Sequence, residues 1–115
     1  LTPGFVIRGT APKIVLIRAI GPGLAQLGVG GLLADPQFSV FPSGSDVAIA
    51  SSNDWGGTAA LKAAFTAAGA FNLAADNSKD AAIVLTLPPG GYTVVTSGVA
   101  NTTGTALVEV YDLDP

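Results

Sequence analysis

Residues 81–113 read AAIVLTL-PPGG-YTVVTSGV-ANTTG-TALVEVYDL, and this stretch decides the fold class. Three runs rich in Val, Ile, Leu, Thr and Tyr alternate with two short breaks of Pro, Gly and Asn, which is typical of β-strands joined by turns. In the first break two prolines restrict φ, and Gly90 and Gly91 permit a positive φ that other residues resist. The pattern predicts an antiparallel three-stranded meander.

The residues before this stretch add four strand-like runs and one helix. The four runs are residues 5–8, 13–20, 38–41 and 47–50, of which the last two form a predicted hairpin across the turn at residues 42–46. Seven strands without a repeated β–α alternation predict a mainly β fold. We expect a two-layer antiparallel β-sandwich, jelly-roll-like or immunoglobulin-like, with one short inserted helix, forming a single domain over residues 1–115.

The predicted helix covers residues 58–68, TAALKAAFTAA. Apolar residues at i, i+3, i+4 and i+7 form one stripe that can pack against a sheet; they are Leu61, Ala64, Phe65 and Ala68. Thr58 is a plausible N-cap, and Gly69 suits the position after the last helical turn.

The run KIVLIRAI at residues 13–20 is apolar in both of its alternating sets, which predicts a strand that is covered on both faces. Arg18 interrupts it, and we expect this side chain to reach solvent from an edge or to form a partly buried ion pair with Glu109 or Asp35. The Gly-rich residues 21–36 that follow lack the Lys-Ser/Thr of a phosphate-binding loop and any βαβ context. We interpret them as a packed loop whose leucines, Leu24, Leu27, Leu32 and Leu33, cover this strand.

The composition is unusual for a chain without a membrane-length apolar run. Hydrophobic residues make up 49% of the 115 residues and charged residues 11%, against roughly 25% charged in ordinary domains. The mean hydropathy is +0.54, yet no run approaches the roughly 20 apolar residues of a spanning helix. We therefore predict no membrane span and expect part of the surface to be covered by a partner.

Several function classes are disfavoured by what the chain lacks. A net charge of −3 and only five basic residues do not make a phosphate-tracking patch, so we predict no nucleic-acid partner. The absence of Cys excludes disulfides and thiolate metal sites. The absence of His removes the commonest general base and metal ligand. We accordingly predict no catalytic residues and no enzymatic activity.

Two polar loops are the remaining ligand candidates. Asp54, Asp76 and Asp80 lie in Asp/Asn-rich segments that could supply oxygen ligands to calcium, although such residues also serve turns and the spacing is not that of a calcium hand. The only Trp, Trp55, could offer a stacking platform for a sugar together with Tyr92 or Tyr111, with Asn53 and Asp54 beside it. We favour the interpretation that Trp55 instead plugs the core beneath the loop before the helix.

Several segments together resemble a known but uncharacterised module. They are FVIRGTAPKIVLIRAIGPGL at residues 5–24, LADPQFSVF at 33–41, NDWGGTAAL at 53–61, DAAIVLTLPPGGYTV at 80–94 and TGTALVEVYDLDP at 103–115. The module occurs, often in several copies, in large secreted or surface proteins of environmental bacteria. The resemblance implies a β-rich extracellular or cell-surface protein that contains several copies of the module. Copies of the module carry a further strand-like segment before the position of Leu1, so the first sheet is expected to lack one strand.

These observations favour a non-enzymatic extracellular structural module that packs with copies of itself or with sister domains in a fibre, sheath or surface array. Strand addition at the two terminal strands is the expected mode. The candidate self-association residues are Phe5, Val6, Ile7, Ile14, Leu16, Val108 and Val110. The alternative is a carbohydrate-binding or adhesion module that uses Trp55 to hold a polysaccharide. We expect no cofactor and no metal, and calcium at one of the Asp loops is the alternative.

Overall fold

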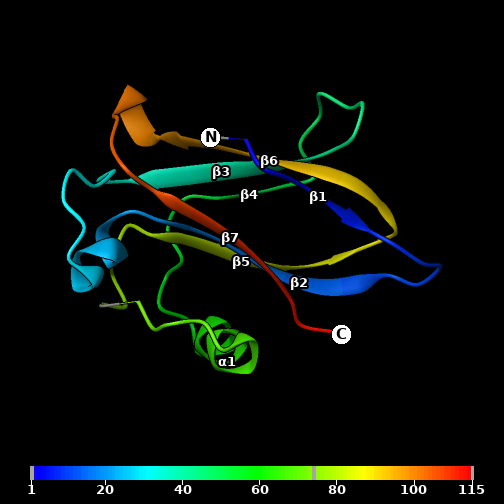
Figure 1. Ribbon diagram of the computed structural model, residues 1–115, viewed down its shortest axis with the longest axis horizontal. Coiled ribbons are helices and arrows are strands. Elements are labelled where there is room, and N and C mark those ends of the chain that lie inside the picture. The colour runs from blue at the N-terminus through cyan, green and yellow to red at the C-terminus, as the bar shows by residue number, and fades with distance from the viewer. Residues whose placement is uncertain (1, 74, 115) are drawn as a thin grey trace.

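The computed structural model describes residues 2–73 and 75–114 and confirms the predicted two-layer antiparallel β-sandwich with one short α-helix (Figure 1). The four-stranded sheet has the order β1-β6-β3-β4, and the three-stranded sheet has the order β5-β2-β7. Two 3-10 helices, η1 (Pro22–Leu27) and η2 (Val99–Asn101), lie in the connections. The strands are β1 (Gly4–Ile7), β2 (Lys13–Ile20), β3 (Pro36–Pro42), β4 (Ala50–Ser52), β5 (Ala81–Leu87), β6 (Gly90–Gly98) and β7 (Leu107–Asp112).

The predicted meander is wrong, although its three strands are present. β6 lies between β1 and β3 in the four-stranded sheet, whereas β5 and β7 flank β2 in the other sheet. The break between β5 and β6 is therefore a corner between sheets. Pro88 and Pro89 suit a corner because neither can donate to a strand ladder, and the Tyr92 hydroxyl donates to the Pro88 carbonyl oxygen at 2.6 Å.

β2 is the central strand of its sheet and is covered on both faces, as its sequence predicted. Val15, Ile17 and Ala19 point between the sheets, where they meet Phe38, Val40, Tyr92 and Val94 of the four-stranded sheet. Leu16 and Ile20 point the other way, into a second cluster with Leu24, Trp55, Phe65 and Leu73. Each large side chain buried in this way contributes roughly 1.5–3 kcal/mol, so β2 organises both cores.

The helix α1 (Ala59–Ala68) covers the outer face of the three-stranded sheet (Figure 1). The Thr58 hydroxyl accepts the Leu61 N–H at 3.2 Å, and Gly69 ends the helix in a left-handed conformation with φ of 71°. Ala64 and Phe65 are buried, and Leu61 and Ala68 pack beside them. The predicted apolar stripe and both caps are confirmed. None of the helices in residues 2–73 and 75–114 combines the length and hydropathy of a membrane-crossing segment.

Two loop predictions need correction. The second strand of the hairpin is Ala50–Ser52 rather than residues 47–50, so the connection is longer than predicted. Val47 and Ile49 alternate as in a strand but their side chains are 68% and 50% exposed, although the Ile49 N–H donates to the Val40 carbonyl oxygen of β3 at 2.8 Å. In the Gly-rich loop Leu24 and Leu33 are buried, whereas Leu27 is exposed at the end of η1.

The docking of α1 predicts different effects for two residues that are three positions apart. Phe65 is 1% exposed, so Phe65→Ala should lower the free energy of unfolding by about 3–5 kcal/mol. Lys62 forms an exposed ion pair with Asp76 at 2.9 Å, and Lys62→Ala should change stability by less than about 1 kcal/mol. Urea unfolding measures both variants. Small and equal effects would show that α1 is not docked on the sheet.

Candidate functional site

Arg18 lies at the centre of the second core and is fully buried. Its Nε donates to Glu109 Oε1 at 2.8 Å, and Nη2 lies 2.7 Å from the same oxygen as an ion-pair contact without hydrogen-bond alignment. Its Nη1 donates to the Phe71 carbonyl oxygen at 2.7 Å. Of the two predicted partners, the structure confirms Glu109, which stands directly opposite Arg18 in the β2–β7 register; Asp35 makes no ion pair with it.

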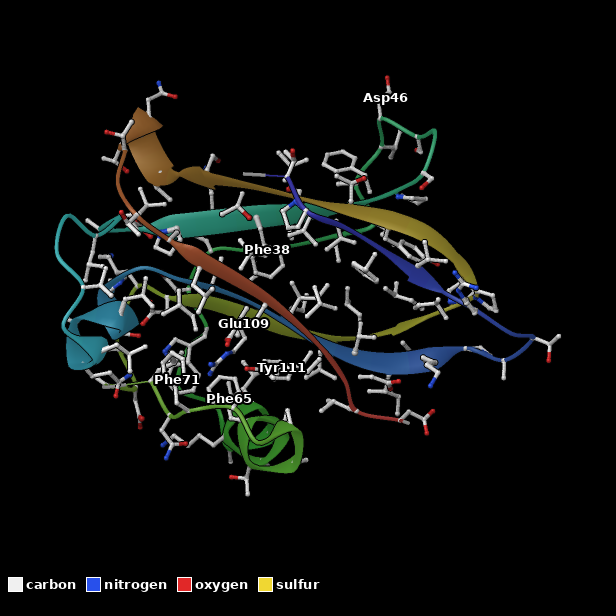
Figure 2. All side chains as sticks on the ribbon, viewed as in Figure 1. Phe38, Asp46, Phe65, Phe71, Glu109 and Tyr111 are labelled. Atoms are coloured by element: carbon white, nitrogen blue, oxygen red, sulfur yellow. The ribbon has the colours of Figure 1, made fainter. Side chains whose placement is uncertain are left out.

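Aromatic rings enclose this guanidinium. Its central carbon lies 4.7 Å from the ring centroids of both Phe65 and Phe71 and 6.0 Å from that of Tyr111. Figure 2 shows these three side chains and Glu109 gathered between β7 and α1. The Tyr111 hydroxyl donates to Glu109 Oε2 at 2.7 Å. Burial raises the pKa of Tyr111, and the adjacent Glu109 carboxylate raises it further. The cluster uses its own polar atoms internally, so we assign it a structural role.

Asp80, one of the calcium candidates, is fully buried and serves as an anchor for backbone groups. Its Oδ1 accepts the N–H groups of Gly21 and Gly23 at 2.8 and 3.1 Å, and its Oδ2 accepts the Ser78 hydroxyl at 2.8 Å. Asp80 thereby fastens the start of the Gly-rich loop to the start of β5.

The other two calcium candidates are exposed and, unlike Asp80, do not anchor backbone groups of the described residues. Asp76 pairs with Lys62 on the surface, and Asp54 is exposed. Within residues 2–73 and 75–114 no group of three or more His, Cys, Asp or Glu side chains converges as a metal site would require. The calcium interpretation therefore has no ligand cluster in the described part of the chain.

Trp55 plugs the second core and does not present a ring to solvent. It is 4% exposed, its ring centroid lies 5.3 Å from that of Phe65, and its Nε1 donates to Ser78 Oγ at 3.0 Å. Tyr92 is also buried, stacked on Phe5 at 5.5 Å. The interpretation of Trp55 as a sugar-stacking platform is therefore wrong, because its ring is buried beside the helix and has no face exposed to a sugar. Asn53 and Asp54 remain exposed.

The predicted self-association strands lie together at one side of the sandwich. β1 is an edge of the four-stranded sheet and β7 an edge of the three-stranded sheet, and in Figure 1 both run in front of the other strands. A groove of about 340 Å³ lies between them, lined by apolar residues of β1, β2 and β7 and by three charged residues. The apolar lining includes Phe5, Val6, Ile7, Val15 and Val110, and the charged residues are Arg8, Lys13 and Asp112.

The side chains at this groove show which positions an added strand would cover. Val110 stands opposite Ile17 and so points between the sheets, yet it is 38% exposed. Val6 is 66% exposed, and Phe5 is half-buried. Among the other candidates Ile7 is buried and Val108 half-buried in the core, and Ile14 is exposed on the opposite face of β2. Leu16 is fully buried under α1, so an added strand would not reach this candidate residue.

Backbone groups at both edges point outward at this side. Leu113 N donates to Ile14 O at 2.9 Å, so by alternation the N–H and C=O of Val110 point away from β2. Val94 N donates to Pro3 O at 2.9 Å, so by the same alternation the N–H and C=O of Val6 point away from β6. The described residues supply no hydrogen-bond partner for these outward groups of Val6 and Val110.

On the opposite side of the sandwich, one side chain links the edges of the two sheets. Ser52 Oγ of β4 accepts the Ala82 N–H at 3.2 Å and donates to the Ala82 carbonyl oxygen at 3.1 Å. Both outward backbone groups of that residue on the β5 edge are thus satisfied. The two sides of the sandwich therefore differ, because one is joined across the sheets and the other is open.

No family model matches the sequence, and neither the curated proteins nor the solved structures include a match to the chain. The fold itself assigns the chain to the two-layer antiparallel β-sandwiches. Within that class its distinguishing features are the buried Arg18–Glu109 pair and the open side between β1 and β7.

The buried ion pair predicts an asymmetric mutational response. Glu109→Gln leaves the fully buried Arg18 without its counter-charge, and should destabilise the fold by about 3–5 kcal/mol. Arg18→Met removes the buried charge itself and should cost less. Asp35→Asn is the matched control, since Asp35 forms no ion pair in the described residues, and should leave the melting temperature unchanged. Equal melting temperatures for Glu109→Gln and Asp35→Asn would refute the assigned role of the pair.

Proposed function

We propose that this chain is a non-enzymatic structural module that assembles with copies of itself or with sister modules by strand addition at the open side between β1 and β7. The observation that carries the proposal is the incomplete cover of Phe5 and Val110, which point between the sheets but remain partly exposed at a groove. An interior that opens to solvent along two strand edges is a template for a further strand.

A strand seated in this groove would gain two kinds of interaction. The outward N–H and C=O groups of Val6 or Val110 would enter a β-ladder, each bond contributing about 0.5–1.5 kcal/mol net. The exposed surface of Val6, Val110 and Phe5 would be covered, at roughly 25 cal/mol per Å² of apolar area. Both terms favour an apolar β-strand over a helix or a small molecule, and this chain contains several such strands.

Charges at one end of the groove would restrict the register of the incoming strand. Lys13 Nζ lies 2.8 Å from Asp112 Oδ2, and Arg8 lines the groove near them. The hydrogen bond from Lys13 lowers the pKa of the Asp112 carboxyl, and the backbone N–H of Asp114 lowers it further. The Asp112 carboxyl is therefore ionised at neutral pH, and an apolar strand would avoid this end of the groove.

The hydrogen-bonded link between β4 and β5 on the opposite side supports the choice of β1 and β7. Natural β-proteins protect the strand edges that must not pair, and the Ser52 contacts to Ala82 do so on the β4–β5 side. The resemblance to a repeated surface module supports copies or sister modules as partners and an extracellular or cell-surface location. The charged fraction of 11% agrees with a surface that is partly covered in an assembly.

A proline exchange at the open edge tests the mode of assembly. Val110→Pro removes an N–H that points away from β2 and so leaves the β2–β7 ladder intact. We expect it to weaken concentration-dependent assembly at least about tenfold in sedimentation velocity. The matched control is Val84→Pro, which removes an outward N–H of the β5 edge and should assemble like the wild type.

Two results would contradict the proposal. One is a wild-type chain that stays monomeric at millimolar concentration. The other is equal assembly of the wild type and Val110→Pro, with both folded by circular dichroism. If Val84→Pro abolished assembly and Val110→Pro did not, the β5 edge would be the interface and the open groove would not.

A further inference from the structure

The outer face of the four-stranded sheet is uncovered, in contrast to the outer face of the other sheet. Figure 1 shows α1 on the far side of the three-stranded sheet, with β3, β4 and β6 forming the opposite layer. Phe38, Val40 and Val94 are buried between the sheets, so the residues that alternate with them point outward. These outward residues are Gln37, Ser39 and Phe41 of β3, Ser51 of β4, and Thr93, Val95 and Ser97 of β6.

This face holds two adjoining hollows that share Phe41 and Val95. The first, of about 340 Å³, extends from these two residues over Gln37, Ser39, Ser51, Asn53 and Ser97. The second, of about 300 Å³, extends from them over Thr93 and the turn residues Pro42, Ser43, Gly44 and Ser45. Together they form a shallow trough across the sheet with an aromatic ring and an aliphatic side chain in the middle.

The trough is lined by hydroxyl and amide groups and by no charged side chain. The register places Ser39 beside both Ser51 and Val95. Gln37 Nε2 makes one long hydrogen bond, 3.3 Å, to Ser97 Oγ. Within residues 2–73 and 75–114 the side chains of Ser39, Ser51 and Asn53 make no hydrogen bond. Their donors and acceptors are therefore available to a ligand.

We infer that this trough binds a neutral polysaccharide, with one sugar unit in each hollow. The half-buried Phe41 offers an apolar surface to the C–H face of a pyranose ring, and the adjacent amides and hydroxyls meet its hydroxyl groups. A neutral ligand fits because an acidic glycan would find no cation in the lining. Asp46, at the tip of the loop that follows the second hollow (Figure 2), would further disfavour a polyanion.

The site is distinct from the strand-edge groove and does not depend on assembly. The trough lies on β3, β4 and β6, whereas the groove lies between β1 and β7. Asn53 was a candidate from sequence, but the aromatic partner is Phe41 and not Trp55, which is buried behind the other sheet.

Isothermal titration with neutral and acidic probes of equal length tests the inference. The neutral probes are cellohexaose, maltohexaose and mannohexaose, and the acidic probe is a hexamer of guluronate. We expect at least one neutral probe to bind with a Kd of about 1 mM or tighter and the acidic probe to bind more weakly. Phe41→Ala should weaken binding at least about tenfold, and Phe41→Tyr should restore it.

Asn53→Ala should weaken binding about threefold through loss of one neutral hydrogen bond, while Asn77→Ala, an exposed Asn outside the trough, should not. Val110→Pro should retain wild-type affinity, which separates this site from strand addition. The inference is overturned if no neutral probe binds, if the acidic probe binds more tightly, or if folded Phe41→Ala binds like the wild type.

Discussion

A cation in the buried part of the central strand β2 constrains most of this structure. Arg18 lies between Leu16 and Ile20 on the face of β2 that α1 covers, so its charge must be matched within the protein. Glu109 provides that match only in the observed register of β2 and β7. A slip of one residue would turn Glu109 to the other face of the sheet. The ion pair therefore sets the position of β7, and the rings of Phe65, Phe71 and Tyr111 set how α1 and its following loop close over it.

With β7 placed by Arg18, the two sides of the sandwich become unequal. Ser52 of β4 bonds to the backbone of Ala82 of β5, so a hydrogen-bonded link joins the two sheets on that side. On the side of β1 and β7 no comparable link joins the two sheets among residues 2–73 and 75–114. The Lys13–Asp112 pair lies at one end and connects β2 to β7 within a single sheet. The groove between β1 and β7 thus gives an added strand a defined location.

The distribution of polar groups divides the surface in a similar way. Ion pairs lie at the helix surface, at one end of the open groove and in the second core. The outer face of the four-stranded sheet instead carries hydroxyls and amides around Phe41 and Val95. A module with an open strand edge and a separate neutral face could join copies through the edge while the face remains exposed to a ligand.

The sequence by itself determined the elements and their class, because these depend on local patterns. Periodicity located the helix and its caps, and alternation located most of the strands, including β2 with cover on both faces. The sequence also limited the expected ion-pair partners of Arg18 to two residues, of which Glu109 is correct. Only the tertiary structure decided the strand order, since a Pro-Gly break shows where the chain turns but not whether it turns within a sheet or between sheets. The role of Asp80 and the outward position of Phe41 likewise depend on which distant segments cover each residue, and a local sequence pattern does not show this.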